Sequence, residues 1–381
     1  MAGLYIHIPF CKQACSYCNF YFLTRKELVQ PFVDALLEEI ASYSSHPFSD
    51  QTIRTIYIGG GTPSLLNPDQ LGTIFRRLDE VFKIDAEEVT VEMNPDDVSR
   101  EYLSNLHSFG VTRASMGVQS FDPALLLTMH RAHDPSEAKK ALSLIKESKF
   151  SSFTADLIYG NPGQTIESLS EDIDRLMAYE PPHISAYSLT VEPGTRLGKQ
   201  VELGRVDVPD DDVVSDHFDL VKSKLSLYGL RQYEVSNFAI PGKEAVHNSN
   251  YWRHVNYLGL GPSAHSLFWS GTGARRWNNK KDIKLYFAGE WKSLHDEITE
   301  LDLEDLAEER LMLGLRTISG VTEAELEDRY SYKLSVRQKE WVARQKGEGY
   351  VADDSNTDRI QLTDQGLKIA DYLIVDLITK H

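Results

Sequence analysis

A regular alternation of strand-like and helix-like segments over the first half of the 381-residue chain limits its fold more than any other feature. Amphipathic stretches at 28–43, 67–82, 99–109, 135–148 and 166–178 predict helices. Between them, six apolar runs have the composition of buried strands: 4–8, 55–58, 89–92, 113–118, 153–158 and 184–189. A helix that joins two strands makes them parallel, and such crossovers are right-handed. The pattern therefore leaves an open doubly wound α/β sheet or a barrel.

Polar and glycine residues recur where these predicted strands end. The cysteines of the chain follow the first strand, and residues 59–62 follow the second. Glu92, Gln119 and Asp156 lie at or near the ends of later strands. Folds of parallel strands build their sites at the carboxyl ends of the strands, so we expect these side chains to share one site.

The composition of the chain excludes several classes of function. Its formal net charge of −17 comes from 40 basic and 57 acidic residues, spread over solvated acidic runs without a basic stripe. Such a field repels a polyanion, so no nucleic-acid partner is expected. No run approaches the roughly 18 apolar residues of a membrane span. The first residues also lack the basic region and cleavage site of a secretory leader. We therefore expect a cytoplasmic protein with at most peripheral membrane contact.

The three cysteines of the chain, Cys11, Cys15 and Cys18, form one C-x3-C-x2-C segment. An odd set packed this closely cannot be a disulfide framework, and clustered thiols in a reducing compartment indicate metal or redox chemistry. Thiolates are the usual ligands of iron–sulfur clusters, and three of them leave one iron of a [4Fe–4S] cube open. The alternative is a structural Cys3His zinc site, with His7 as the fourth ligand.

Other residues at the strand ends could surround a small polar ligand. The glycine run that continues into Thr62 and Pro63 lets backbone N–H and C=O groups approach a ligand closely. Glu92 and Asp156 are acceptors suited to ribose hydroxyls or an ammonium, and Arg131 can bind a carboxylate through two nitrogens. Together they suit a zwitterionic nucleoside.

The cysteine spacing, with an aromatic residue before the last cysteine, resembles the signature of the radical S-adenosylmethionine superfamily. In that superfamily the open iron binds the amino and carboxylate groups of S-adenosylmethionine, and an electron from the cluster cleaves it to a 5′-deoxyadenosyl radical. The resemblance implies a partial (β/α)6 TIM-like barrel. It also implies that the following residues contact S-adenosylmethionine: Tyr5, Tyr17, Gly60, Gly61, Thr62, Glu92, Gln119, Arg131 and Asp156.

Longer segments are similar to one group within this superfamily, the anaerobic coproporphyrinogen III oxidases. The similarity rests on residues 5–11, 117–121, 156–160 and 162–165 and extends over about 4–317. Two departures matter: Phe20 stands where the oxidases have a fourth cysteine, and only ten residues precede the first cysteine. Both resemble the HemW branch of haem chaperones.

The segment 247–252 matches the H-N-x-x-Y-W pattern that this branch links to haem binding. Histidine is a common axial ligand of haem iron, and tyrosine and tryptophan offer flat faces and polar tips to a porphyrin. The resemblance therefore makes His247 the predicted haem contact. The residues alone favour the other interpretation, a loop whose histidine caps a helix and whose aromatic rings pack on the barrel, because a single histidine is not specific for haem. His254 and His265 are the candidates for a second axial ligand, whereas His130 and His133 are expected to shape the cofactor pocket or the surface.

We therefore expect a radical S-adenosylmethionine core over 1–240, a connecting segment over 241–300 and a helical, winged-helix-like module over 301–381. The resemblance implies haem binding and delivery to respiratory haemoproteins, with a flavodoxin or ferredoxin as reductant and a homodimer left open. No catalytic residue is assigned. The alternative function is oxygen-independent coproporphyrinogen III oxidase, which decarboxylates two propionates of its substrate to vinyl groups.

Overall fold

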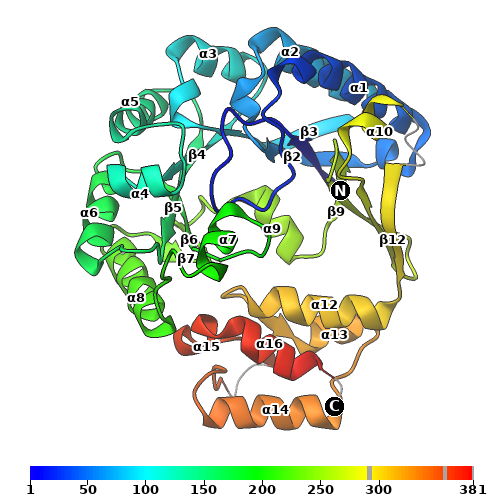
Figure 1. The fold of residues 1–381 in the computed structure, drawn as a ribbon. Coiled ribbons are helices and arrows are strands. Elements are labelled where there is room, and N and C mark those ends of the chain that lie inside the picture. The colour runs from blue at the N-terminus through cyan, green and yellow to red at the C-terminus, as the bar shows by residue number, and fades with distance from the viewer. Residues whose placement is uncertain (290–293, 355–357, 380–381) are drawn as a thin grey trace.

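In the computed structural model, which describes residues 1–289, 294–354 and 358–379, six parallel strands form the centre of the fold (Figure 1). They lie side by side in chain order, as the sequence predicts for a (β/α)6 arrangement. Their bounds are β1 (Ala2–Ile8), β2 (Thr52–Gly60), β3 (Lys83–Met93), β4 (Arg113–Gln119), β5 (Ser152–Tyr159) and β6 (His183–Ser188).

Helices cover the outer face of these strands and form a ring around them (Figure 1). Most begin with a side-chain cap, such as the capping box of Asn67 and Gln70 at α2 and that of Asp134 and Glu137 at α5. The helices of the ring are α1 (Val29–Ser42), α2 (Pro68–Val81), α3 (Arg100–Ser108), α4 (Pro123–Thr128), α5 (Pro135–Lys146), α6 (Ile166–Met177) and α8 (Asp211–Leu227). The short helix α7 (Arg196–Glu202) lies inside the ring in Figure 1, where the Leu197 N–H donates to the Ser16 carbonyl of the cysteine loop.

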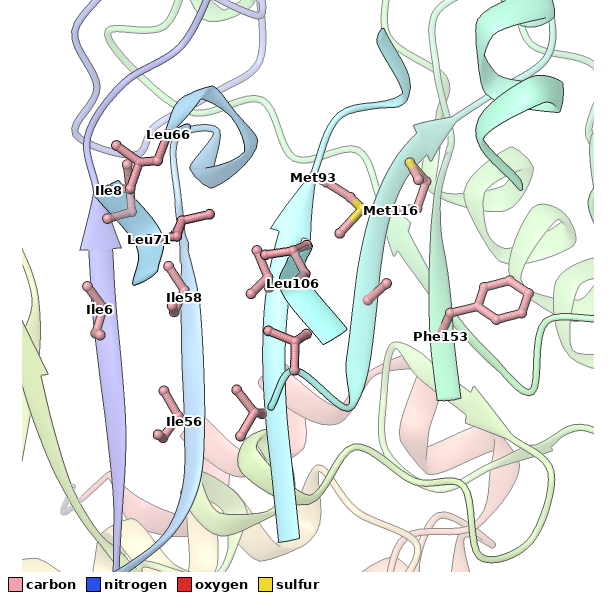
Figure 2. Close-up of a cluster of buried hydrophobic side chains, with 14 of the residues drawn as sticks. Ile6, Ile8, Ile56, Ile58, Leu66, Leu71, Met93, Leu106, Met116 and Phe153 are labelled. Atoms are coloured by element: carbon pink, nitrogen blue, oxygen red, sulfur yellow. The ribbon is translucent and has the colours of Figure 1, made fainter. Parts of the chain in front are cut away.

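Alternate residues of each central strand face opposite sides, which separates the hydrophobic core from the interior of the barrel. On β1 and β2, Ile6, Ile8, Ile56 and Ile58 face the helices and are buried. Figure 2 shows these side chains packed beside Leu71 of α2 and other apolar residues of the same layer. The inward-facing positions of the same strands are polar, aromatic or glycine instead, so the interior of the barrel can hold a polar site.

The sheet continues beyond both ends of the six-stranded core. On the β1 side, β9 (Asn256–Leu260) pairs parallel to β1 and is followed outward by β10 (His265–Trp269), β11 (Ala274–Asn279) and β12 (His295–Leu301). On the β6 side, β8 (Asn237–Ala239) and β7 (Arg231–Gln232) pair antiparallel. The predicted connecting segment 241–300 thus contributes strands to the main sheet, together with α9 (Val246–Trp252) and α10 (Ile283–Phe287).

The C-terminal part of the chain has its own hydrophobic core, centred on residues such as Leu311, Leu326 and Trp341. Its helices lie together below the barrel in Figure 1, and a two-stranded β13–β14 pair accompanies them, as expected for a winged-helix-like module. The elements are α12 (Leu303–Leu315), β13 (Val321–Thr322), α13 (Glu323–Tyr330), α14 (Val336–Gly347), β14 (Arg359–Ile360), α15 (Asp364–Lys368) and α16 (Ala370–Ile378). Among the described helices, none combines the length and apolarity that a membrane span needs.

Candidate cofactor site and the HNxxYW helix

A cavity of about 440 Å³ opens at the carboxyl ends of the six parallel strands. All three cysteines line it, together with most of the side chains that the sequence predicts for the cofactor. These are Tyr17, Gly60, Gly61, Thr62, Glu92, Gln119, Arg131 and Asp156. The structure thus brings the predicted ligands of the cluster and those of S-adenosylmethionine into one chamber.

The cysteine loop that follows β1 is held at the mouth of the cavity by backbone contacts on both sides. The Cys11 N–H donates to the carbonyl of Leu23 at 2.9 Å, and the Ser16 N–H donates to the carbonyl of Met129 at 2.9 Å. Burial raises the pKa of Cys11 to about 12, opposed in part by a hydrogen bond with Thr62. Iron must therefore displace a proton when this thiol becomes a ligand.

His7 is not available to complete a zinc site with these cysteines. Its Nδ1 is 3.0 Å from the Tyr5 hydroxyl, and its Nε2 is 2.9 Å from the carbonyl oxygen of Tyr21. Both ring nitrogens are thus in use inside the barrel. In the described part of the chain, no group of three or more His, Cys, Asp or Glu side chains is arranged to hold a single metal ion.

The glycine run at the end of β2 requires glycine, because a Cβ at these positions would clash with neighbouring residues. Gly60 has a φ of +110°, and a Cβ there would lie 2.6 Å from Nδ1 of His7. A Cβ on Gly61 would lie 2.6 Å from the carbonyl oxygen of Phe10 in the cysteine loop. The loop therefore lies directly against the cysteine segment, and its backbone forms one wall of the cavity.

Two inward-facing carboxyl groups lie in the cavity with raised pKa values. Burial raises the pKa of Glu92 to about 7, although the Tyr57 hydroxyl donates to it at 2.6 Å and the Gly60 N–H at 3.1 Å. Burial likewise raises the pKa of Asp156 to about 6, opposed by Ser185 and by nearby arginines. A cationic or hydroxyl-bearing ligand would favour their ionised forms, as an ammonium or a ribose does.

Arg131 links the cysteine loop to the polar wall of the cavity. Its Nη1 is 3.5 Å from Sγ of Cys15, and its Nη2 donates to Oδ1 of Asn94 at 2.7 Å and to the carbonyl of Gly117 at 2.9 Å. Its Nε is buried without a partner among the described residues, as is Oε1 of Gln119. Buried polar atoms of this kind indicate a bound ligand, because an unpaired one costs roughly 1–3 kcal/mol.

Tyr5 is partly buried on β1 and is not among the residues that line the cavity. Its ring stacks on Tyr57 with 6.2 Å between centroids, and its hydroxyl is turned to His7. Tyr57, which we did not single out in the sequence, lines the cavity in its place. The alternation of β2 could have indicated this position, because Tyr57 and Gly59 share the inward face.

The H-N-x-x-Y-W segment forms α9, which lies inside the ring of strands and helices (Figure 1). His247 is 1% exposed. Its Nδ1 is 2.9 Å from Oγ1 of Thr55, its Nε2 is 2.8 Å from the hydroxyl of Tyr251, and its ring stacks on Tyr57. Haem ligation through either nitrogen would therefore require α9 to move. The next residue, Asn248, lines the cavity.

The other histidines take separate positions. His254 is 2% exposed; its Nε2 is 2.9 Å from Glu309 of α12, and its Nδ1 is 3.2 Å from the Tyr330 hydroxyl. His265 is exposed on β10. His133 is buried against the carbonyl of Val118 near Arg131, and neither His130 nor His133 lines the cavity.

Fold and site together define a radical S-adenosylmethionine protein. The family model for the radical SAM superfamily matches residues 5–176, and the model for the HemN C-terminal domain matches 301–369. The chain belongs to the HemW family: it is 35% identical over 340 residues to the heme chaperone HemW of Bacillus subtilis (strain 168), which covers 88% of each chain. Membership of the superfamily implies a [4Fe–4S] cluster and S-adenosylmethionine.

Further relatives agree with this assignment. The heme chaperone HemW of Escherichia coli (strain K12) is 38% identical over 266 residues, or 69% of each chain. Radical S-adenosyl methionine domain-containing protein 1, mitochondrial, of Mus musculus is 34% identical over 84% of this chain and 74% of its own. The solved coproporphyrinogen III oxidase (HemN) of E. coli has a TM-score of 0.84 at 23% identity and covers 99% of this chain and 90% of that one, which supports the fold.

Proposed function

We propose that this chain binds haem and delivers it to haemoproteins of the respiratory chain, as a radical S-adenosylmethionine-type protein with a [4Fe–4S] cluster. The observation that carries the proposal is the shared chamber. The cysteines line the mouth of the cavity, and α9, which contains the haem-linked motif, contributes Asn248 to the same cavity. The names of the HemW relatives support haem as the cargo.

The residues present fit both cofactors. Cys11, Cys15 and Cys18 would supply three thiolates to the cluster, which leaves one iron for the methionine end of S-adenosylmethionine. When bound and reduced by a flavodoxin or ferredoxin, the cluster supplies an electron to the sulfonium. Arg131, which lines the cavity beside Cys15, would bind the cofactor's carboxylate, and Glu92 would accept from its ammonium.

His247 remains our proposed haem contact, and the contacts that bury it show that haem binding requires a conformational change. Two hydrogen bonds and a stacked ring hold it within the barrel, so its use as a ligand couples haem uptake to a displacement of α9. The same displacement would alter the cavity wall at Asn248. This gives the cofactor chamber a physical means to influence haem transfer.

The test is anaerobic reconstitution followed by haem titration with and without S-adenosylmethionine, using wild type, His247→Ala and, as a matched control, His265→Ala. Stoichiometric haem uptake that His247→Ala weakens and His265→Ala leaves unchanged supports the proposal. The shift of the Soret band reports whether a histidine ligand has been lost. Uptake equal in all three proteins would remove His247 from the haem site.

The same samples separate the chaperone function from oxidative decarboxylation. Coproporphyrinogen III is added with dithionite and S-adenosylmethionine, and the products are analysed for vinyl groups. We expect no vinyl product at useful turnover. Efficient formation of protoporphyrinogen would overturn the proposal in favour of the oxidase.

A further inference from the structure

Arg113 is a buried cation inside the barrel to which neither the sequence nor the proposed function assigns a role. It begins β4 and is 3% exposed, yet it lines the cofactor cavity. Its Nε and Nη1 have no hydrogen-bond partner among the described residues, and no ion pair within 4.0 Å includes it in that part of the chain. Buried charges are normally paired, so the N–H donors of this guanidinium that lack a described partner are available to bind a ligand.

The strands beside Arg113 do not satisfy it. Thr90 and Ser152 are its register partners on β3 and β5, and their hydroxyl oxygens are also buried without a partner among the described residues. The nearby carboxyl groups have other hydrogen-bond partners, since Glu92 accepts from Tyr57 and the Gly60 N–H and Asp156 accepts from Ser185, so they act on Arg113 through their charge and not through a described hydrogen bond. A layer of unsatisfied polar atoms therefore lies at the deep end of the barrel, below the cofactor residues.

Asn248 of α9 adds a second polar group to the same cavity. It is partly exposed there, and its amide has no recorded hydrogen bond with the described residues. Its neighbours in the chain are fixed, because the N–H groups of Val246 and His247 both donate to Glu88, at 2.9 Å and 3.0 Å. α9 therefore holds Asn248 at a defined place from which its amide can donate to a ligand.

We propose that Arg113 and Asn248 form a carboxylate-binding subsite at the deep end of the cavity, which takes the carboxylate end of an alkyl carboxylic acid. A planar guanidinium with free N–H groups binds a carboxylate through two parallel hydrogen bonds, and the amide of Asn248 adds a third donor. The acid is either a propionate arm of a tetrapyrrole or a free short-chain acid. The assignment of this carboxylate to a tetrapyrrole rests on the proposed function, whereas the existence of the subsite does not depend on it.

The first test compares propionate with propionamide, its neutral analogue, by saturation-transfer NMR on the full chain. We expect millimolar binding of propionate alone. Binding should fall at least tenfold in Arg113→Gln and more mildly in Asn248→Ala, and it should be unchanged in Arg205→Gln, which alters an exposed arginine. Equal binding of propionate and propionamide, or full propionate binding in Arg113→Gln, would overturn the subsite.

Thermal unfolding supplies an independent readout of the same variant. Because Arg113 has unpaired buried donors, Arg113→Gln should leave the melting temperature unchanged or raise it by a few degrees. A residue with a purely structural role would lower it on substitution. A clear fall in melting temperature, together with unaltered propionate binding, would contradict the proposal.

A second experiment compares the binding of haem and haem dimethyl ester, and it tests whether the bound carboxylate belongs to a tetrapyrrole or to a free acid. Tighter binding of haem than of its ester in wild type, with the difference lost in Arg113→Gln, assigns the subsite to a propionate arm. Equal binding of haem and ester, with propionate selectivity intact, assigns it to a free acid and still supports the subsite. If neither haem compound binds while propionate does, the proposed function fails and the subsite stands.

Discussion

The two ends of α9 face regions of opposite character. Towards the cysteine loop, the cavity contains buried polar atoms on Arg113, Gln119 and Arg131 that have no partner in the described part of the chain. Towards the C-terminal module, the junction around His254 is fully connected. His254 bonds to Glu309, which also accepts from Arg276, while Arg329 donates to the His254 carbonyl at 2.7 Å.

Buried polar groups at the junction stabilise the fold, whereas those in the cavity are available to a ligand. At the junction, Glu309 accepts from both Arg276 and His254, and Arg329 donates to the His254 carbonyl, so the network fixes the segment that follows α9 against α12 and α13. In the cavity, leaving a guanidinium unpaired costs free energy that only a bound molecule offsets. Substitutions at the junction should therefore reduce stability, whereas substitutions in the cavity should reduce binding.

The largest effect is expected at the cysteine loop. Cys15→Ala should abolish iron and labile-sulfide retention after anaerobic reconstitution, because two thiolates cannot hold the cube firmly. Circular dichroism should show an unchanged fold, since the side chain of Cys15 is half-exposed. Full iron retention in this variant would remove Cys15 from the cluster site.

At the junction, Glu309→Ala should lower the free energy of unfolding by about 2 kcal/mol, because it leaves Arg276 and His254 without their shared acceptor. Iron content should be unchanged. Glu300→Ala is the matched control, since its pair with Arg275 is exposed and should contribute below about 1 kcal/mol. Chemical denaturation measures both, and equal losses would break the distinction between the two regions.

In the cavity, Arg131→Gln should weaken S-adenosylmethionine binding by about tenfold to a hundredfold, the range expected for a lost charge-assisted contact. Its free energy of unfolding should change little beside that of Glu309→Ala. Equilibrium binding to the reconstituted protein gives the affinity, with Arg205→Gln as the control. A stability loss without a change in affinity would place Arg131 with the structural residues.

The smallest effect is a pH dependence set by Glu92. Its pKa of about 7 means that the free protein carries a protonated carboxyl below that pH, whereas an ammonium ligand needs the carboxylate. Affinity for S-adenosylmethionine should rise with pH and level off above about 7. Glu92→Gln should bind weakly with a flat profile. If the affinity of the wild type for S-adenosylmethionine fell as the pH rose from 6 to 7, the role assigned to Glu92 would be contradicted.

The sequence predicts the barrel well because its signals are local. Six strand positions and five outer helices follow from apolar periodicity and capping residues such as Asn67. α9 was harder to place, since its seven residues carry no periodicity and its location depends on distant contacts with Thr55 and Glu88. The strands of the predicted connecting segment were missed for the same reason.

The site residues also differ in how far the sequence predicts them. Residues with a spacing signature, such as Cys11 and Gly60, are found in the cavity as predicted from sequence. Arg113 belongs to no recognisable motif, and in the sequence it looks like the ordinary first residue of a strand. Only the alternation of β4, which gives it the same inward face as Ser115 and Gly117, could have suggested it. That Tyr57 rather than Tyr5 lines the cavity depends on how two stacked rings share the interior.

Electron paramagnetic resonance of the reduced, anaerobically reconstituted protein, with and without S-adenosylmethionine, tests the cluster and its open iron directly. We expect about four iron and four sulfide per chain and a cluster signal that changes when S-adenosylmethionine is added, because the cofactor would bind the open iron. A colourless protein containing zinc, or a cluster signal that S-adenosylmethionine leaves unaltered, would contradict it.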